Sequence, residues 1–302
     1  MPQPVDHPNT PWQAGSFRGR TRQLLFGAMY DDPAMELEAF APRSRVFCIA
    51  AAGCTARALS AAGHDVTAVD INPEQVQYAQ ARAAGAPMRE GTVERMLSRG
   101  RALLPLLGWT ERRRLAFLSL DNPVEQIQYW RQTLDSLRWR AAIDTLLSAS
   151  LLRLVYAGPF LAFLPRHFGA DVRARLQRGW ANHANRSNPY AWRLLLGESR
   201  SASEPPAPAI RFAIRFACAD AAAYLESCGA ASFDAFSLSN ISDGASPSYL
   251  QRLFSAVKHA AAPGAVVVTR SFAEPATDEH NLAARDRSLL WGSVNVHRTG
   301  EL

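Results

Sequence analysis

The sequence predicts an α/β protein with a Rossmann-like, doubly wound sheet and a helical insertion between the second and third strands. Two observations lead to this prediction. Strand and helix signals alternate over residues 45–85, and parallel neighbouring strands need such helical crossovers. The alternation then stops over residues 90–200, which show no convincing strand, and strand signals return at Ile210.

The first half of the expected sheet follows a polar N-terminal region. Residues 1–20 are polar and proline-rich, which is typical of an arm outside the core. The segment Gln23 to Phe40 reads as helical, with an acidic interruption at Tyr30 to Pro33. The first strand is expected at Arg45 to Ala50, because a short apolar run there ends at small residues.

The next helix and strand follow directly. A loop and helix over residues 51–63 close with Gly63, a residue suited to a helix C-cap. The second strand is expected at His64 to Asp70. Asn72 then caps a helix that has Pro73 at its first position.

Residues 90–208 are expected to form a helical lobe. Asn122 caps a helix over Pro123 to Ser148, and a second helical stretch runs from Ala170 to Gly197. The serine- and proline-rich segment Ser199 to Pro208 links the lobe back to the sheet. The chain therefore divides into three parts: residues 1–89, an arm and the first half of the sheet domain; residues 90–208, the inserted lobe; and residues 209–302, the second half of the sheet domain.

Three further strand signals complete an expected sheet of five strands. They lie at Ile210 to Cys218, at Phe233 to Ser239 and at Ala265 to Ser271. The last is the most continuous β-branched run in the chain. A helix over Ser246 to Ala262 separates the fourth strand from the fifth.

The composition favours a protein without a membrane span. The most apolar stretch, Leu151 to Leu164, is interrupted by Arg153, Gly158 and Pro159 and falls short of the roughly 20 residues that a spanning helix needs. The N-terminus lacks the basic-then-apolar pattern of a signal peptide, so a cytoplasmic location is expected. The four cysteines have spacings that fit neither a zinc site nor a redox pair, which predicts buried, reduced thiols and no metal site.

The net charge of +6 arises mostly from arginines between Arg89 and Arg215. A basic surface suits nucleic acid, anionic lipid or acidic metabolites, and an ordinary solvated face is an equally good interpretation. The lobe combines these arginines with many aromatic residues. It is either a packed cap over a cofactor or an apolar acceptor cleft close to an anionic membrane, with a peripheral contact to that surface. The sequence leaves the oligomeric state open.

Three pieces of the sequence are expected to meet at the carboxyl ends of the strands, where doubly wound sheets bind their ligands. The turn Ala50 to Gly53 contains small residues that let a ligand approach backbone N–H groups. Asp70, at the tip of the second strand, can accept hydrogen bonds from both hydroxyls of a ribose. Asp220 precedes Ala221 at a helix start, where it can cap the helix and accept from an adenine amino group.

The turn after the first strand indicates an adenosyl cofactor without phosphate. The Gly-x-Gly-x-x-Gly pattern that NAD enzymes use for close contact with pyrophosphate is absent, and only Gly53 remains. S-adenosylmethionine has no phosphate and tolerates a looser turn containing Ala51 and Ala52. The expected cofactor is therefore S-adenosylmethionine.

Four segments carry a family resemblance: Phe26 to Pro33, Val46 to Gly53, Ala68 to Gln75, and Phe233 to Asp243. The distinctive stretches among them are Asp-Ile-Asn-Pro-x-Gln and Leu-Ser-Asn-Ile-Ser-Asp. On these residues the chain resembles the S-adenosylmethionine:diacylglycerol 3-amino-3-carboxypropyltransferase family, the first enzymes of betaine-lipid synthesis, which have a class I methyltransferase-like fold. A long helical insertion before the third strand also fits this family.

The resemblance assigns roles to two groups of residues. One group would hold the cofactor: Gly53, Asp70, Ile71, Asn72 and Gln75. The other would border the reacting centre: Ser239, Asn240 and Asp243.

The resemblance also implies a reaction. This family transfers the 3-amino-3-carboxypropyl group and leaves methylthioadenosine, whereas a methyltransferase transfers the methyl group. Either displacement chiefly needs positioning, and a hydroxyl acceptor, on a lipid or a small molecule, also benefits from a general base. The candidates for that base are Asp243, His183 and Tyr190. Arg193 and Arg270 are candidates for pairing with the cofactor carboxylate or an anionic acceptor.

Two other functions stay open. The first is a methyltransferase acting on a small molecule or on RNA, since Asn188-Pro-Tyr190 is similar to the Asn-Pro-Pro-Tyr box of amino-methylating enzymes. That box follows the fourth strand, whereas Asn188 lies in the lobe, so no nucleic-acid partner is expected. The second is a non-catalytic Rossmann-like scaffold, for which the alanines of the turn, Ala51 and Ala52, are the best support.

Overall fold

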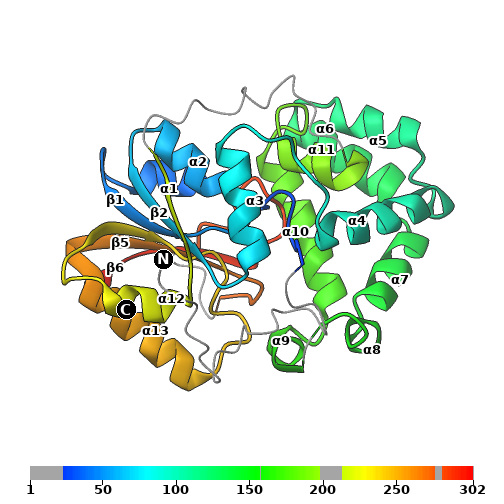
Figure 1. The fold of residues 1–302 in the computed structure, drawn as a ribbon. Helices are drawn as coiled ribbons and strands as arrows, with labels where there is room; N and C mark the ends of the chain where they lie inside the picture. The colour runs from blue at the N-terminus through cyan, green and yellow to red at the C-terminus, as the bar shows by residue number, and fades with distance from the viewer. Residues whose placement is uncertain (1–22, 157, 198–212, 276–280, 302) are drawn as a thin grey trace.

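The computed structural model describes residues 23–156, 158–197, 213–275 and 281–301. A six-stranded sheet with the order β3-β2-β1-β4-β5-β6 lies beside a helical lobe (Figure 1). Strands β1 to β5 are parallel, and β6 runs antiparallel to β5. The predicted fold class is confirmed: the chain has a methyltransferase-like α/β fold with a long helical insertion between β2 and β3.

The strands are β1 (Arg45–Ile49), β2 (Asp65–Asp70), β3 (Arg215–Cys218), β4 (Phe233–Ser237), β5 (Ala261–Ser271) and β6 (Ser293–Arg298). The first five correspond to the strands that the sequence predicts, although residues 210–212 of the expected third strand lie outside the described residues. The sixth, β6, is an additional edge strand. Because it pairs with β5 along six registered positions, from Ser271 with Ser293 to Val266 with Arg298, it is a full member of the sheet.

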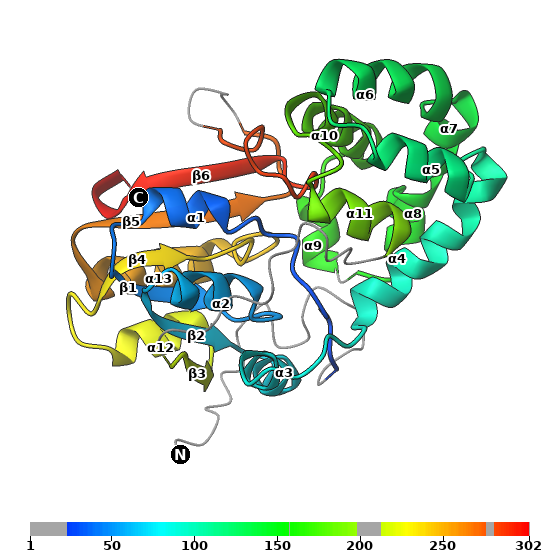
Figure 2. The same ribbon diagram turned by 90° about the horizontal axis from the view of Figure 1, so that it is seen from above.

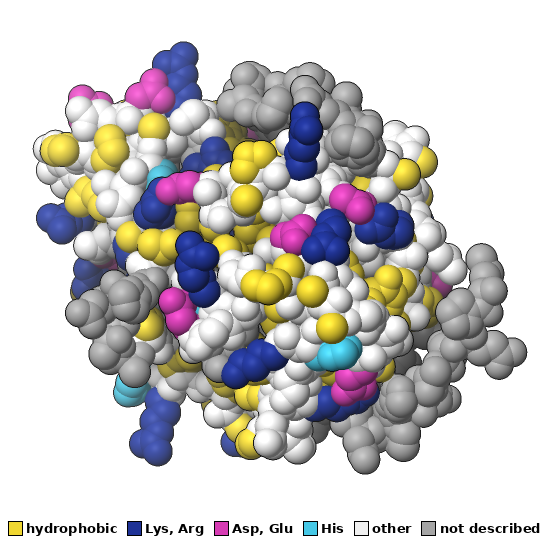
Figure 3. Space-filling model, turned by 90° about the vertical axis from the view of Figure 1, so that its left-hand side faces the viewer, with side chains coloured by type: hydrophobic (Ala, Val, Ile, Leu, Met, Phe, Trp, Pro, Cys, Tyr) yellow, Lys and Arg dark blue, Asp and Glu magenta, His cyan; other side chains and the backbone are white. Residues whose placement is uncertain are grey.

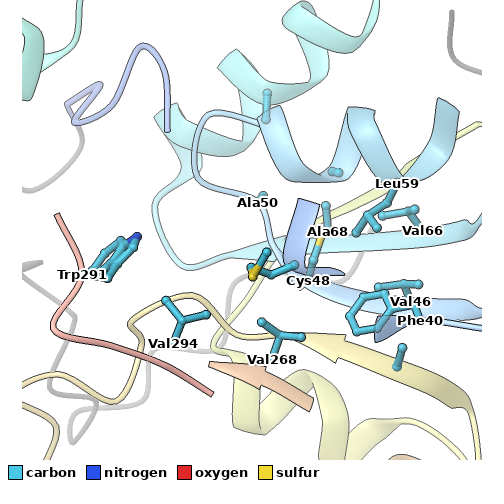
Figure 4. Close-up of a cluster of buried hydrophobic side chains, with 14 of the residues drawn as sticks. Phe40, Val46, Cys48, Ala50, Leu59, Val66, Ala68, Val268, Trp291 and Val294 are labelled. Atoms are coloured by element: carbon cyan, nitrogen blue, oxygen red, sulfur yellow. The ribbon is translucent and has the colours of Figure 1, made fainter. Parts of the chain in front are cut away.

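One face of the sheet packs against the helix that precedes β1 in the chain and the helices that follow it. Val46 and Cys48 of β1 are fully buried there, together with Met35 of α1 (Ala34–Ala39) and Leu59 of α2 (Cys54–Ala61), as Figure 4 shows in part. Ala79 of α3 (Pro73–Ala83) completes this cluster. Side chains along β1 alternate between the two faces of the sheet. The turn after this strand leads directly into the start of α2.

The opposite face packs against the helices of the second half. Phe47 of β1 and Phe236 of β4 are fully buried against α12 (Ala221–Ser227) and α13 (Pro247–Ala260). Burying a side chain of this size stabilises the fold by about 2 kcal/mol. Both faces of the parallel strands are thus covered, which explains the continuous apolar runs in their sequences.

Among its described residues, the lobe consists of helices joined by turns, with an isolated β-bridge residue at Tyr156. Its helices are α4 (Thr92–Leu103), η1 (Leu104–Leu107), α5 (Glu111–Leu118), α6 (Pro123–Tyr129), α7 (Leu137–Leu146), α8 (Ala149–Leu152), α9 (Gly158–Phe163), α10 (Phe168–Asn182) and α11 (Pro189–Leu196). Four buried tryptophans fill its centre, Trp109, Trp130, Trp139 and Trp180, and the rings of Trp130 and Trp180 lie 4.2 Å apart. These aromatic residues are therefore core of the lobe.

A buried arginine joins the lobe to the sheet. Arg175 of α10 donates to the carboxylate of Glu274 (2.7 Å) and to the main-chain oxygens of Phe272 (2.7 Å) and Leu290 (3.1 Å), in the segments that follow β5 and precede β6. Gly179, one turn further along α10, lies against Leu289, and a Cβ atom there would meet Leu289 Cδ2 at 2.2 Å. A larger residue at this position would therefore require the Leu289 side chain to move.

Three helix predictions are corrected. The helical stretch expected over Ala170 to Gly197 divides into α10 and α11, with a break at residues 183–188. The segment Gln23 to Phe40 is helical only over α1, because side chains from distant elements bind the backbone of residues 24–28 in an extended form. The helix expected over Pro123 to Ser148 divides into α6, a π-helical stretch at Trp130–Leu134, and α7. Ser136 starts the second helix by accepting the N–H of Trp139.

The four cysteines are free thiols. Cys48 is buried and Cys54 and Cys228 are half-buried, but Cys218 is exposed, so the prediction that all are buried is wrong for Cys218. That residue ends β3, the edge strand of the sheet. Within the described parts of the chain, no helix is both long and apolar enough to cross a bilayer.

Candidate functional site

The turn after β1 has the tight geometry that the small residues predict. Ala51 and Gly53 both adopt left-handed backbone angles, with φ of 40° and 74°. Position 53 also favours a residue without a side chain, because a Cβ atom on Gly53 would come within 3.1 Å of Ala79 Cβ. A left-handed alanine costs about 1 kcal/mol, and such strain tends to occur where a protein binds its ligand.

Asp70 connects this turn to the end of β2. One carboxylate oxygen accepts the N–H of Ala51 at 2.9 Å, and the other accepts the N–H of Asn72 at 2.9 Å. Burial raises the pKa of Asp70 to about 6, while the N–H groups of Asn72, Ala51 and Ile71 lower it. These three N–H donors share the four lone pairs of the carboxylate, which leaves one acceptor position for a further hydrogen bond, such as one from a ribose hydroxyl.

Asn72 and Gln75 bind the chain itself. The side chain of Asn72 accepts the N–H of Glu74 as a helix cap and donates to the main-chain oxygen of Gln23 at 2.9 Å. The amide of Gln75 accepts the N–H of Leu25 at 3.0 Å and donates to the oxygen of Phe26 at 2.8 Å. Both side chains expected at the cofactor therefore hold an N-terminal segment against α3.

This segment, residues 23–33, is called the strap. Figure 2 shows it (dark blue) running from beside α3 and α4 to α1, between the sheet and the lobe. Glu94 accepts the N–H groups of Gly27 and Ala28, and the N–H of Met29 lies 3.5 Å from the sulfur of Cys54 at the start of α2. The strap therefore passes over the carboxyl end of β1.

The strap reaches the carboxyl end of β4 through Asp31. Ser239, two residues beyond β4, donates its hydroxyl to Asp31 Oδ2 at 2.6 Å and has a left-handed φ of 49°. Asp31 Oδ1 is buried and has no hydrogen-bond partner among the described residues. Burial raises the pKa of Asp31, whereas Arg270 and the Ser239 hydrogen bond lower it.

β1 and β4 are neighbours in the sheet, and they connect to strands on opposite sides. This is the topological switch point at which doubly wound sheets bind ligands. The strap therefore lies over the switch point, with the strained residues Ala51 and Ser239 on its two sides. The sequence marks Tyr30 to Pro33 as an acidic interruption and as part of a segment that carries the resemblance, but it assigns no role to Asp31, which is therefore the site residue that it misses.

A buried cluster of charges fixes the other end of the strap. Arg270 of β5 is fully buried, and it donates to both carboxylate oxygens of Glu36 (2.6 and 3.0 Å), to Asp286 Oδ2 (3.1 Å) and to the main-chain oxygen of Asp32 (2.7 Å). Arg287 forms a two-point ion pair with Asp32. The guanidinium of Arg270 thus binds acids of the protein itself. Pairing with a cofactor carboxylate, for which the sequence makes Arg270 a candidate, would therefore need a different residue.

Asp243 lies beyond β4, next to the end of β5. It accepts hydrogen bonds from the Ser271 hydroxyl (2.7 Å), the Phe272 N–H (2.9 Å) and the Asn240 amide (3.3 Å). Burial raises its pKa to about 6, and these three donors lower it. A carboxylate with such a pKa is matched to proton transfer near neutral pH.

The two lobe candidates differ in what they contact. Tyr190 is buried, and its hydroxyl donates to the main-chain oxygen of Asp31 at 3.0 Å. Burial raises the pKa of Tyr190 well above its ordinary value, so the phenol stays protonated and acts as a donor that positions the strap. Burial lowers the pKa of His183, and the backbone of Ala284 and Asp286 opposes this shift. Among the described residues, no hydrogen bond joins His183 to Asp31 or Asp243.

Arg193 of α11 also contacts the strap. It donates to the main-chain oxygen of Met29 at 2.9 Å, and its guanidinium lies 5.6 Å from the ring centres of both Tyr30 and Tyr190. The nearby Asn188 accepts the N–H groups of Tyr190 and Ala191 as a helix cap. The Asn188-Pro-Tyr190 motif is therefore a helix start that presents Tyr190 and Arg193 to the strap.

Asp220 follows β3 and caps α12, as the sequence predicts. One oxygen accepts the N–H of Ala223 at 2.9 Å, and the other accepts the hydroxyl of Tyr249 at 2.7 Å. Ala221, the first residue of the helix, is buried. The N–H of Ala219 donates to the main-chain oxygen of Asp70, so the ends of β2 and β3 lie side by side.

The fold and site together define a methyltransferase-like α/β protein with a strap over its switch point. No protein-family model, no curated protein and no solved structure matches the chain.

Proposed function

We propose that this chain is an S-adenosylmethionine-dependent transferase that moves the 3-amino-3-carboxypropyl group to a hydroxyl or amine acceptor. The observation that carries the proposal is the carboxylate of Asp70, which backbone N–H groups hold between the ends of β1 and β2. In a sheet of this order, that position faces a bound nucleoside.

The adenosine half of the cofactor would lie along the ends of β1, β2 and β3. The remaining lone pair of Asp70 would accept one ribose hydroxyl, and the small residues Ala50 to Gly53 would allow close approach of the chain. Asp220, next to the end of β2, would accept from the adenine amino group beside its existing hydrogen bonds.

The amino acid half would lie at the switch point under the strap. Its ammonium group needs acceptors, and Asp31 Oδ1 is a buried carboxylate oxygen there with no hydrogen-bond partner among the described residues. A buried charge without a partner is costly, so a cationic group at this position would relieve a cost that the protein otherwise bears. Ser239 orients Asp31 through its other oxygen.

The chemistry would be an in-line displacement at a carbon next to sulfur. The acceptor oxygen or nitrogen forms a bond to the γ-carbon of the methionine chain, the carbon–sulfur bond breaks, and methylthioadenosine leaves with the electron pair. The acceptor loses one proton, and Asp243, whose pKa is about 6, is the candidate to receive it. The protein's main contribution is to hold the two reactants in line.

The test is the identity of the nucleoside product. The protein is incubated with S-adenosylmethionine and a lipid-plus-metabolite extract, and products are measured by mass spectrometry against a protein-free control. Methylthioadenosine above the control supports the proposal. Adenosylhomocysteine would instead assign methyl transfer to the same site, and absence of S-adenosylmethionine binding at millimolar concentration would indicate a non-catalytic scaffold.

A pair of variants on one strand tests the cofactor site. Asp70→Asn should weaken S-adenosylmethionine binding by about 10- to 100-fold, because a hydrogen bond to a charged group contributes about 1.5–3 kcal/mol. Asp65→Asn is the matched control, since Asp65 begins the same strand at its opposite end. Equal affinities of the two variants, measured by calorimetry, would remove Asp70 from the site.

A further inference from the structure

Exposed apolar side chains are concentrated on the lobe. Of the nine large hydrophobic side chains that are exposed among the described residues, seven lie in the lobe, and the other two are Leu37 and Met88. Six of the seven are leucines on or beside three short elements, η1, α7 and α8. We call this set the leucine face: Leu103, Leu106, Leu137, Leu146, Leu151 and Leu154.

The leucine face spans adjoining helical elements. α7 packs against both η1 and α8, so the three elements that carry the leucines are neighbours. Figure 1 shows α7 and α8 at the edge of the lobe that lies farthest from the sheet. Leu137 is 82% exposed, Leu106 74% and Leu154 73%. Single exposed leucines are ordinary, but a cluster of this kind indicates a surface that binds something.

The same elements carry arginines. Arg99, Arg138 and Arg153 are exposed next to the leucines. The two acids of α7 and its preceding turn are already paired, Asp135 with Arg140 and Asp144 with Arg173. The leucine face therefore presents positive charge together with apolar side chains.

The charge distribution along the chain supports this reading. Residues 90–197 contain 16 arginines and eight acidic residues, a net charge of +8, so the rest of the chain carries −2 of the overall +6. Figure 3 shows the side of the molecule opposite the lobe, where basic and acidic side chains are intermixed. The positive charge of the protein is thus a property of the lobe.

We propose that the leucine face docks on an anionic lipid bilayer. The leucines would enter the boundary between headgroups and acyl chains, and the arginines would pair with lipid phosphates, for which the guanidinium has a matching geometry. Protein-binding surfaces are rich in tyrosine, tryptophan and arginine, and of these the leucine face has exposed arginine, whereas the tryptophans at the centre of this lobe are buried. The mixture of exposed leucine and arginine suits a bilayer better than a protein partner. The proposal is independent of the cofactor and of any catalytic activity.

Co-sedimentation with vesicles tests the proposal. The purified full chain should sediment with vesicles of equal parts phosphatidylglycerol and phosphatidylcholine, and much less with pure phosphatidylcholine. Rising salt concentration should weaken the interaction, because it screens exposed charges.

Matched variants locate the surface. Leu106→Gln with Leu137→Gln should weaken vesicle binding by about tenfold or more, and Arg138→Gln with Arg153→Gln by about fivefold per arginine. Leu37→Gln and Arg43→Gln are the controls, because both residues are exposed on the sheet domain outside the leucine face. All six positions are exposed, so each variant should unfold at the temperature of the unaltered protein.

Three results would overturn the proposal. One is failure to sediment with the anionic vesicles. Another is an equal loss of binding in the control variants. The third is a dimer, detected by light scattering, that the Leu106→Gln and Leu137→Gln changes dissociate, because the leucine face would then be covered by a second copy of this chain.

Discussion

The charge cluster under the strap makes a quantitative prediction about Arg270. Its side chain is fully buried and binds two carboxylates, those of Glu36 and Asp286, as well as the main-chain oxygen of Asp32. In Arg270→Met, an apolar side chain of comparable length replaces the cation while these acids stay in place. The variant therefore removes the cation alone and leaves buried carboxylates without their partner.

The expected loss of stability is about 3–5 kcal/mol, the range for breaking a buried ion pair by removing one partner. Arg45→Met is the matched control. Arg45 forms an equally well aligned two-point pair with Asp234 (2.8 and 3.0 Å), but its side chain is 46% exposed. Exposed pairs contribute at most about 1 kcal/mol, so the two variants should differ several-fold in their effect.

Acid should partly restore the Arg270→Met variant. Arg270 lowers the pKa of both Asp31 and Asp286, whose pKa values burial raises. Without the arginine these pKa values rise further above those of the unfolded chain. The folded state then binds protons that the unfolded state releases, so stability increases as the pH falls through the folded-state values.

Urea denaturation followed by tryptophan fluorescence provides the measurement. At pH 7 the Arg270→Met midpoint should fall by about 1 M, given an m-value at the upper end of the range for small proteins. At pH 5 the difference from the unaltered protein should be smaller. Two results would contradict this role of the charge cluster. One is an Arg270→Met variant that is no more destabilised than Arg45→Met, and the other is a loss of stability in Arg270→Met that is the same at both pH values.

Three further predictions concern the same framework. Burial raises the pKa of Asp286 to about 6, so ionising it costs stability as the pH rises from 4 towards 7. The stability of Asp286→Asn relative to the unaltered protein should therefore be higher, by about 1 kcal/mol, at pH 7 than at pH 5 in paired urea titrations. Ala51→Gly should stabilise the protein by about 1 kcal/mol in thermal unfolding, because glycine relieves the left-handed φ of 40°, and a lower melting temperature would contradict this. Gln126→Leu should lower the free energy of unfolding by about 3 kcal/mol in urea denaturation, because the buried amide binds three main-chain groups of the lobe. A loss below about 1 kcal/mol would show that water or a rearrangement replaces these hydrogen bonds.

The parallel strands could be predicted from sequence because each is buried on both faces and reads as an apolar run. Residues of β1 such as Val46 and Phe47 pack on opposite sides and are both fully buried. β6 is different, because only part of it is buried and its residues Asn295 and His297 are polar. An antiparallel edge strand of this kind gives no apolar run, and only its pairing with β5 defines it.

The site could be predicted where it depends on strand ends. Asp70 and the turn before Gly53 follow from the rule that ligands bind at the carboxyl edge of the sheet, and the structure brings these two segments into hydrogen-bond contact. Asp31 could not be placed in this way. It reaches Ser239 across 208 residues of sequence, and Glu36 reaches Arg270 across 234. Local periodicity contains no information on pairings of that length.

The strap also explains why a helical prediction fails at residues 23–33. Its backbone N–H groups bind Gln75, Glu94 and Cys54. The main-chain oxygen of Asp32 accepts from Arg270, and the Asp32 carboxylate pairs with Arg287. Distant side chains therefore replace the hydrogen bonds that a helix would form within itself. A strap held by apolar contacts alone could slide along the sheet edge with little change in energy. A strap whose carboxylates must pair with arginines in one register cannot slide in this way, because each displaced carboxylate would remain buried and unpaired. The charge cluster therefore fixes where the strap crosses β1 and β4, and with it the position of Asp31 over the switch point.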